Sequence, residues 1–177
     1  MTDGRKALAY GLLIPVALFL PSGVALAAKD YFNNEPKFNF DPSLVQPWQE
    51  AEVPVPAYPR DADLIAVALG PTDTLKLYVD STSVNLASDR VLSFTLVVES
   101  PSGARNVFFD GMRCETRQYR TYAVGSSDGR FVPVKNAHWQ DIPRPSQNGF
   151  RFHLFRHYVC NEISSAVTPR EFLDRLK

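Results

Sequence analysis

Three histidines are the first residues whose type and spacing could support catalysis. His153 and His157 are four apart, so on a helix they would share a face at a spacing that suits a metal ion, and either His138 or a carboxylate would have to supply the third ligand. An H-E-x-x-H pattern is absent from the sequence. Histidines in an amphipathic segment more often place a polar tip at the water boundary. We predict no metal site, catalytic residue or cofactor, and keep a metal-dependent or hydrolytic enzyme using these histidines as the alternative hypothesis.

A second pattern, Gly-Ser-Ser-Asp-Gly at residues 125–129, matches the letters of a nucleophile elbow with Ser127 as the nucleophile. That elbow needs a strand before it and a helix after it. Residues 130–134 have the composition of a strand, and serine, aspartate and glycine are ordinary hairpin residues. The pattern therefore predicts a hairpin.

A third pattern interleaves arginines with aromatic residues, which suits recognition of an anionic ligand or a glycan. On one strand Arg113 and Arg117 would share a face and Arg120 would point the other way, so pairing with the acidic N-terminal half is favoured over one basic cluster. The possible binding surface comprises Trp48, Arg113, Arg117, Tyr119, Arg120, Tyr122 and Trp139.

The N-terminus has the features of an export signal. Arg5 and Lys6 precede an uncharged apolar run at residues 7–20, and Ala-Leu-Ala at residues 25–27 suits a signal peptidase. The run is short for a membrane span and contains Pro15, so cleavage is favoured over a retained anchor. We predict that residues 1–27 are a cleaved secretory signal peptide, that the protein is periplasmic, and that the mature chain has no transmembrane segment.

Export bears on Cys114 and Cys160, the two cysteines of the chain. Even numbers of cysteines usually pair in an oxidising compartment. A reactive thiol pair is the alternative, but such pairs are normally close in sequence, as in C-x-x-C. A structural disulfide is the favoured interpretation.

The charge of the mature chain is unevenly distributed. Residues 28–100 hold 5 basic and 11 acidic side chains, whereas residues 101–177 hold 12 and 7. The near-zero sum excludes a general nucleic-acid binder, which needs a strongly basic face. Two interpretations stay open: halves that lie side by side and offset each other, which we favour, or a dipolar surface that attracts a charged partner.

The elements that must position these residues divide the mature chain into two parts. Residues 28–59 form a Pro-rich extended arm, because its prolines block helix and central-strand hydrogen bonds, and we expect it to cross the domain from Trp48 onward. Residues 60–177 form a single domain. Strand patterns occupy residues 64–69, 75–79, 90–99, 105–116, 117–124 and 130–134, with a bulge at Asp110–Gly111 restoring the phase of the fourth.

The C-terminal quarter combines one ambiguous and one clear segment. Residues 150–160 fit both a strand and a helix, with length favouring the helix. Thr168 can cap a final helix with Pro169 at its first position and Glu171 completing a capping box. The expected fold class is α+β: an antiparallel sheet of about five or six strands packed with one or two C-terminal helices, and one disulfide.

The stretch Ser-Pro-Ser-Gly-Ala-Arg-Asn-Val-Phe-Phe-Asp-Gly-Met-Arg-Cys at residues 100–114 resembles the cryptic neisserial protein-like family of exported proteins from Gram-negative bacteria, mostly β-proteobacteria. The likeness runs from Trp48 to Cys160. It implies an envelope setting and pairing of Cys114 with Cys160, and it carries no catalytic motif.

We therefore expect an exported envelope or periplasmic protein that is a non-enzymatic binding or assembly module, with an envelope protein or a glycan as partner. A glycan-binding module would need an exposed groove lined by Trp48, Trp139 or Tyr122. No nucleic-acid partner is expected.

Overall fold

The computed structural model describes residues 41, 43, 46–144 and 149–177. The predicted signal peptide and the first part of the arm lie outside these residues, as does Ser146, a residue type that can cap the helix expected at residues 150–160. Residues 46–177 form one compact unit. Within the described part of the chain, no helix has both the length and the apolar character needed to cross a membrane.

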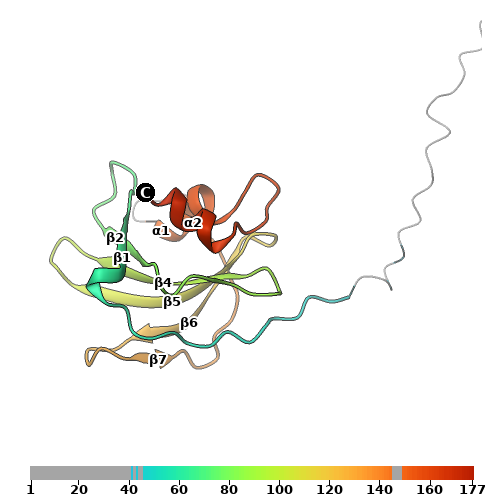
Figure 1. The fold of residues 1–177 in the computed structure, drawn as a ribbon, viewed down its shortest axis with the longest axis horizontal. Helices are drawn as coiled ribbons and strands as arrows, with labels where there is room; N and C mark the ends of the chain where they lie inside the picture. Colours follow the sequence, from blue (N-terminus) through green and yellow to red (C-terminus); the bar gives the residue numbers. More distant parts are fainter. Residues whose placement is uncertain (1–40, 42, 44–45, 145–148) are drawn as a thin grey trace, which may run out of the picture. The chain divides into compact units, whose positions relative to one another are not determined.

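An antiparallel sheet forms the centre of the fold (Figure 1). Its main path is β1-β2-β4-β5-β6-β7, β3 pairs with β4, and β8 pairs with β6. The eight strands are β1 (Leu64–Val67), β2 (Lys76–Asp80), β3 (Asn85–Leu86), β4 (Leu92–Glu99), β5 (Arg105–Arg113), β6 (Gln118–Gly125), β7 (Phe131–Pro133) and β8 (Gln140–Asp141).

The C-terminal helices cover one face of this sheet (Figure 1). They are α1 (Phe150–Leu154), continued by the π-helical turn η4 (Phe155–Val159), and α2 (Pro169–Arg175); a short 3-10 turn, η3 (Asp61–Asp63), precedes β1. The ambiguous segment is therefore helical, and Leu154 and Val159 are fully buried in the core beneath it. The predicted α+β class, with two short C-terminal helices, is confirmed.

The start of α2 follows its sequence signals. The amide of Glu171 donates to Thr168 Oγ1 at 3.2 Å, and Pro169 occupies the first turn. Instead of completing a capping box, the Glu171 carboxylate accepts a hydrogen bond from Arg175. Phe172 is fully buried and packs on Phe94 of β4 with ring centroids 5.1 Å apart, which anchors a helix too short to be stable alone.

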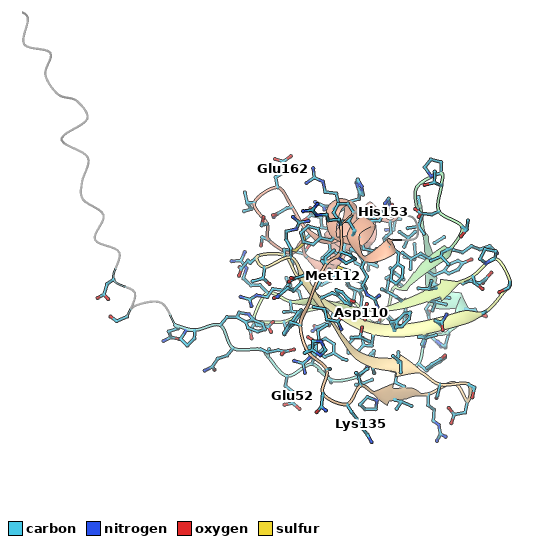
Figure 2. All side chains as sticks on the ribbon, turned by 180° about the vertical axis from the view of Figure 1, so that it is seen from behind. Glu52, Asp110, Met112, Lys135, His153 and Glu162 are labelled. Atoms are coloured by element: carbon cyan, nitrogen blue, oxygen red, sulfur yellow. A yellow bond between two sulfur atoms is a disulfide. The ribbon has the colours of Figure 1, made fainter. Side chains whose placement is uncertain are left out.

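Residues 48–58 of the arm lie against the opposite face. Tyr58 packs on Phe131 with ring centroids 5.4 Å apart, and its ring lies over Gly125, where an added Cβ would meet the Tyr58 hydroxyl at 2.9 Å. Figure 2 shows the two sides: His153 and Glu162 lie on the helix side, Glu52 and Lys135 on the other, and Asp110 and Met112 between them.

Covering both faces changes the environment of β4. Its alternation predicts a half-buried strand with polar residues toward water, yet Ser93 and Thr95 are 1% and 0% exposed. Their face is covered by residues 82–85, since Ser93 Oγ donates to the Asn85 carbonyl at 3.4 Å and the Thr95 amide donates to Ser83 Oγ at 2.8 Å, and arm residues 53–56 line a cavity together with Ser93. The expectation of one solvated face is therefore wrong.

The predicted bulge exists but lies in the neighbouring strand. The pairing of β4 with β5 runs without interruption, whereas the pairing of β5 with β6 shifts between Phe109 and Asp110. Phe109 pairs with Ala123 and Asp110 with Thr121, which leaves Tyr122 as the extra residue. Met112 and Cys114 need no change of phase, because both faces of β5 are buried.

The disulfide joins Cys114, at the end of β5, to Cys160, after η4, with Cα atoms 5.7 Å apart. The predicted pairing is confirmed. The bond ties the helical segment to the β5–β6 hairpin, and closing a loop of 46 residues stabilises the fold by roughly 4 kcal/mol in the chain-entropy account.

Candidate functional site

The seven residues of the predicted binding surface separate onto the two sides of the sheet. A turn at residues 114–117 divides the segment, so that Arg113 pairs with Gln118 and Gly111 with Arg120. Arg113 and Arg120 therefore share the arm face, while Arg117 lies in the turn with a φ of 55°. The prediction that Arg113 and Arg117 share a face, with Arg120 on the other, is therefore wrong. It treated residues 113–120 as one strand, whereas a hairpin turn reverses the chain between Arg113 and Arg120.

On the arm face, Glu50 is the centre of a group that we call the arm cluster. Its carboxylate accepts hydrogen bonds from Tyr122 Oη at 3.0 Å and Trp139 Nε1 at 3.2 Å, and forms an ion pair with Arg120. This pair confirms the expected match with the acidic N-terminal half for Arg120 alone, since Arg113 lies 3.8 Å from the Glu115 carboxylate and Arg117 forms no ion pair among the described residues. Burial and the Glu50 charge raise the pKa of the Tyr122 hydroxyl well above its usual range, so this phenol stays protonated as a donor.

Trp48 completes the arm cluster. The Arg113 guanidinium lies 3.9 Å from the centre of the indole, and the Trp139 ring meets it edge-on with centroids 5.8 Å apart. Trp48 Nε1 donates to the Asp89 carbonyl at 3.1 Å, and the Ala51 amide donates to the Asp89 carboxylate at 2.8 Å. Trp48, Trp139 and Tyr122 are thus engaged by one another and by the arm, and do not line an exposed glycan groove.

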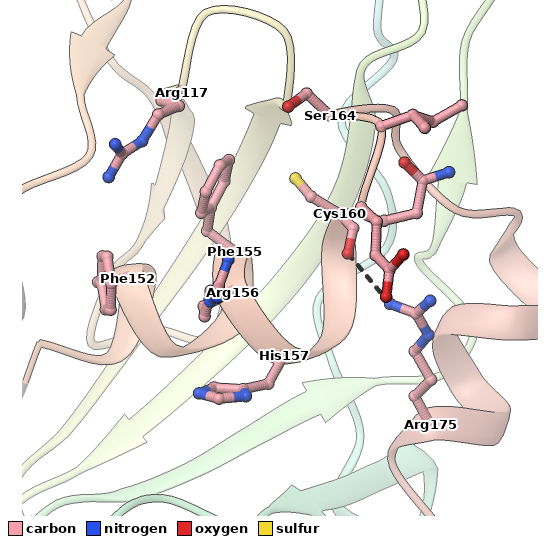
Figure 3. Close-up of a pocket in the computed structure, with 11 residues that line it drawn as sticks. Arg117, Phe152, Phe155, Arg156, His157, Cys160, Ser164 and Arg175 are labelled. Carbon is pink, nitrogen blue, oxygen red and sulfur yellow. Dashed lines mark hydrogen bonds between the residues drawn. The ribbon is translucent and has the colours of Figure 1, made fainter. Parts of the chain in front are cut away.

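A groove opens on the opposite side, between η4 and the loop that follows it (Figure 3). Its volume is about 1020 Å³. Figure 3 shows the side chains of Arg117, Phe152, Phe155 and His157 along one side, with Ser164, Cys160 and Arg175 on the other. The lining is completed by Arg156, Asn161, Glu162 and Ile163.

The groove carries more positive than negative charge. Arg175 is committed to the fold, since it donates to the carbonyls of Tyr158 and Cys160 at 3.2 Å and pairs with Glu171. Arg117 lies over the Phe155 ring at 5.6 Å, and among the described residues neither Arg117 nor Arg156 forms an ion pair. These two exposed guanidinium groups are available to a carboxylate or phosphate.

The rings of His153 and His157 are in contact, with centroids 4.6 Å apart and planes tilted by 45°. His153 Nε2 lies 2.7 Å from the Ala68 carbonyl, a contact in which the ring nitrogen must donate, whereas His138 is held near Asn136. Within the described ranges, no group of three or more His, Cys, Asp or Glu side chains is placed to hold a metal ion. The three-histidine site of the alternative hypothesis is therefore not formed.

Burial lowers the pKa of His157, and His153 and Arg156 add to the effect. The neutral imidazole is consequently favoured in the unliganded groove. An anion bound beside it would favour the charged form instead.

Ser127 lies in the hairpin between β6 and β7, so no helix follows it. The neighbouring Ser126 donates to the Arg130 carbonyl at 2.8 Å, and Gly129 takes the positive φ that the turn requires. The hairpin prediction is correct. Asp80, which follows the strand pattern at residues 75–79, is a residue type expected to accept local hydrogen bonds in a turn. Its carboxylate does so, since it accepts from the Thr82 amide and hydroxyl at 3.0 and 2.8 Å.

Asp110 and Arg151 form a buried pair that the sequence analysis did not identify. Asp110 Oδ2 lies 2.9 Å from Arg151 Nε, and the Thr121 hydroxyl donates to Oδ1 at 2.6 Å. The Arg151 guanidinium also lies 4.4 Å from the Tyr119 ring centre, which places Tyr119 on the helix side. Burial raises the pKa of Asp110, and the Arg151 charge opposes that rise. The sequence signal was an acidic residue within the run Val-Phe-Phe-Asp-Gly-Met at residues 107–112, which has no other charged residue.

Comparison with known proteins gives one match. The model of the CNP1-like family matches residues 44–177, which include the arm cluster, the disulfide and the groove. No curated protein matches, and no solved structure matches.

Proposed function

This chain belongs to the CNP1-like family, and we propose that it is an exported protein of the cell envelope that works as a non-enzymatic binding or assembly module. The groove beside η4 is its binding site, and its ligand is anionic. The finer setting, the periplasm of a Gram-negative bacterium, rests on the export signal and on the family resemblance.

The observation that carries this proposal is the pair of exposed arginines, Arg117 and Arg156, at the groove. An exposed arginine without a carboxylate partner keeps five donors for a ligand. The half-buried rings of Phe152 and Phe155 line the same groove, so a ligand could bring both a negative charge and an apolar group.

The lining favours an acidic segment of an envelope protein over a glycan. Ile163 is 82% exposed at the groove, and exposed apolar side chains beside arginines are typical of protein interfaces. The tryptophans that would suit a sugar, Trp48 and Trp139, lie in the arm cluster instead.

Fluorescence anisotropy with a labelled oligoglutamate peptide tests the site. Arg117→Ala/Arg156→Ala should weaken binding at least about tenfold, because each charge-assisted hydrogen bond to a carboxylate is worth about 1.5–3 kcal/mol. Arg60→Ala/Arg130→Ala is the matched control, since it removes the same charge from two exposed positions outside the groove. An equal loss of affinity in the two double variants would show that binding depends on the overall charge of the protein and not on the groove.

The same titration separates the two ligand classes. Polygalacturonate, an anionic glycan, should compete poorly with oligoglutamate, and an oligoglutamine peptide should not bind. If polygalacturonate bound more tightly than oligoglutamate, the partner would be a glycan.

Export has a separate test. The protein should be recovered from the periplasmic fraction of a Gram-negative host with Ala28 as its first residue. Recovery of the intact N-terminus from the cytoplasm would contradict the envelope setting.

A further inference from the structure

The arm cluster contains hydrogen-bond donors that its own carboxylate does not reach. Among the described residues, the buried Nε atoms of Arg113 and Arg120 have no hydrogen-bond partner. The Glu50 carboxylate already accepts hydrogen bonds from another nitrogen of Arg120, from Tyr122 Oη and from Trp139 Nε1. Buried donors are normally satisfied, so these two Nε atoms could each take a further acceptor, beside the carboxylates of Glu50, Asp89 and Glu115 that already take part in the cluster or pair with its arginines.

The arm holds this surface through side chains and not through a backbone ladder. Described residues 46–60 form no strand, and Pro54, Pro56 and Pro59 lack the amide that a strand would use. The backbone contact at the cluster is the Ala51 amide on the Asp89 carboxylate. Lifting residues 48–51 would therefore leave the hydrogen bonds of β4, β5 and β6 intact.

We propose that the surface formed by Asp89, Arg113, Arg120, Tyr122 and Trp139 is a peptide-binding site for an acidic segment that carries a tryptophan. Residues 48–50 occupy it as an internal ligand, and a partner protein displaces them with a segment of the same chemistry. This site is independent of the groove, which lies on the other side of the sheet.

The chemistry of the partner follows from the occupant in place. An indole fits between the Arg113 guanidinium and the Trp139 ring, with its N–H on the Asp89 carbonyl. A carboxylate two residues later meets Arg120, Tyr122 and Trp139. A partner with a further carboxylate beside these groups would bind more tightly than the arm, because it could reach the unsatisfied Nε donors.

A labelled peptide of residues 46–53, Gln-Pro-Trp-Gln-Glu-Ala-Glu-Val, tests the proposal against the full mature chain. Trp48→Ala/Glu50→Ala vacates the site, so the peptide should bind this variant at least about tenfold more tightly than the wild type, whose arm competes. Adding Arg120→Ala should remove the gain.

Matched controls keep the test decisive. A peptide with Ala for Trp48 and Gln for Glu50 should not bind, and Glu52→Ala, which changes an exposed residue of the arm, should leave peptide affinity at the wild-type level. Circular dichroism checks that each variant is folded, and Glu50→Gln alone replaces the double variant if that one unfolds.

Two results would overturn the proposal. One is equal peptide affinity for the wild-type and vacated chains. The other is a wild-type dimer in sedimentation velocity that Trp48→Ala/Glu50→Ala abolishes, since the occupant would then be the arm of a second copy. Loss of oligoglutamate binding in Arg117→Ala/Arg156→Ala affects neither outcome, so the groove and the site under the arm are tested independently.

Discussion

Two pairs of arginines lie on opposite sides of the same sheet and are used differently. Arg113 and Arg120 lie under the arm, where the first stacks on Trp48 and the second pairs with Glu50. Arg117 and Arg156 lie at the groove, exposed and without an ion pair among the described residues. The four side chains have the same chemistry, so their surroundings decide their roles.

The difference shows how an internal acidic segment changes what a basic surface can do. Under the arm, charge and stacking are largely matched, and the arginines hold residues 48–50 in place. At the groove, no segment of the described chain plays that part, so the donors remain for a ligand. Substitutions on one side of the sheet can therefore be tested for an effect on stability and on binding at the other side.

The largest expected effect comes from the disulfide, which ties the groove wall to the hairpin. Cys114→Ala/Cys160→Ala should lower the free energy of unfolding by about 4 kcal/mol, as expected for the loop it closes. Denaturant unfolding measures the loss. Binding of oligoglutamate should weaken as well, because Cys160 lines the groove. An unchanged unfolding midpoint would contradict this account.

Asp110→Ala should destabilise the fold by roughly 3 kcal/mol, because it leaves the Arg151 guanidinium packed among aromatic rings without its carboxylate. Asp110→Asn keeps an acceptor for Arg151 and should lose less stability than Asp110→Ala. Thermal unfolding of both variants provides the comparison. Equal losses would show that the charge of Asp110 is unimportant.

Glu50→Ala should lower the free energy of unfolding by about 2 kcal/mol, because it leaves donors of Arg120, Tyr122 and Trp139 without their acceptor. Glu52→Ala is the control, and as an exposed change it should stay within about 0.5 kcal/mol. Denaturant unfolding distinguishes them. Groove binding should be unaffected in both variants, and a loss there would mean that the two sides of the sheet are coupled.

The smallest effect concerns pH. The fold lowers the pKa of His157 below the ordinary histidine value of about 6.5, so the unfolded chain takes up this proton first as the pH falls. Protonation of His157 therefore lowers the free energy of unfolding below about pH 6.5. A bound anion favours the charged imidazole, so oligoglutamate affinity should rise severalfold between about pH 7 and about pH 5.5, where glutamate is still ionised. Anisotropy titrations at both pH values measure this change. His157→Ala should flatten the dependence, whereas His138→Ala should not.

The predictability of each feature depended on how local its cause was. The cap at Thr168, the hairpin at residues 125–129 and the Asp80 turn follow from groups within a few residues of one another, so their sequence patterns were sufficient. The phase of β5 and the burial of Ser93 and Thr95 could not be predicted, because they depend on the segments that cover each face of the sheet, which include residues 82–85, the arm and the C-terminal helices.

The candidate sites show the same limit. The residue types were correctly selected for the arm cluster, in which Trp48, Arg113, Arg120, Tyr122 and Trp139 meet, but Arg117 and Tyr119 lie on the other side of the sheet. Glu50 was missed because nothing in its neighbourhood distinguishes it from Glu52. The groove was missed because its lining comes from the hairpin turn, η4, the loop after it and α2.

The sequence by itself determined the α+β class, the disulfide, the hairpin at residues 125–129 and the start of the last helix, because composition, spacing and short-range hydrogen bonds specify them. It favoured a helix at residues 150–160 by length, and the structure confirms it. The tertiary structure alone decided which arginines share a face and which of them keep free donors. These properties depend on contacts between segments distant in the chain, and alternation along one strand carries no information about what covers each face.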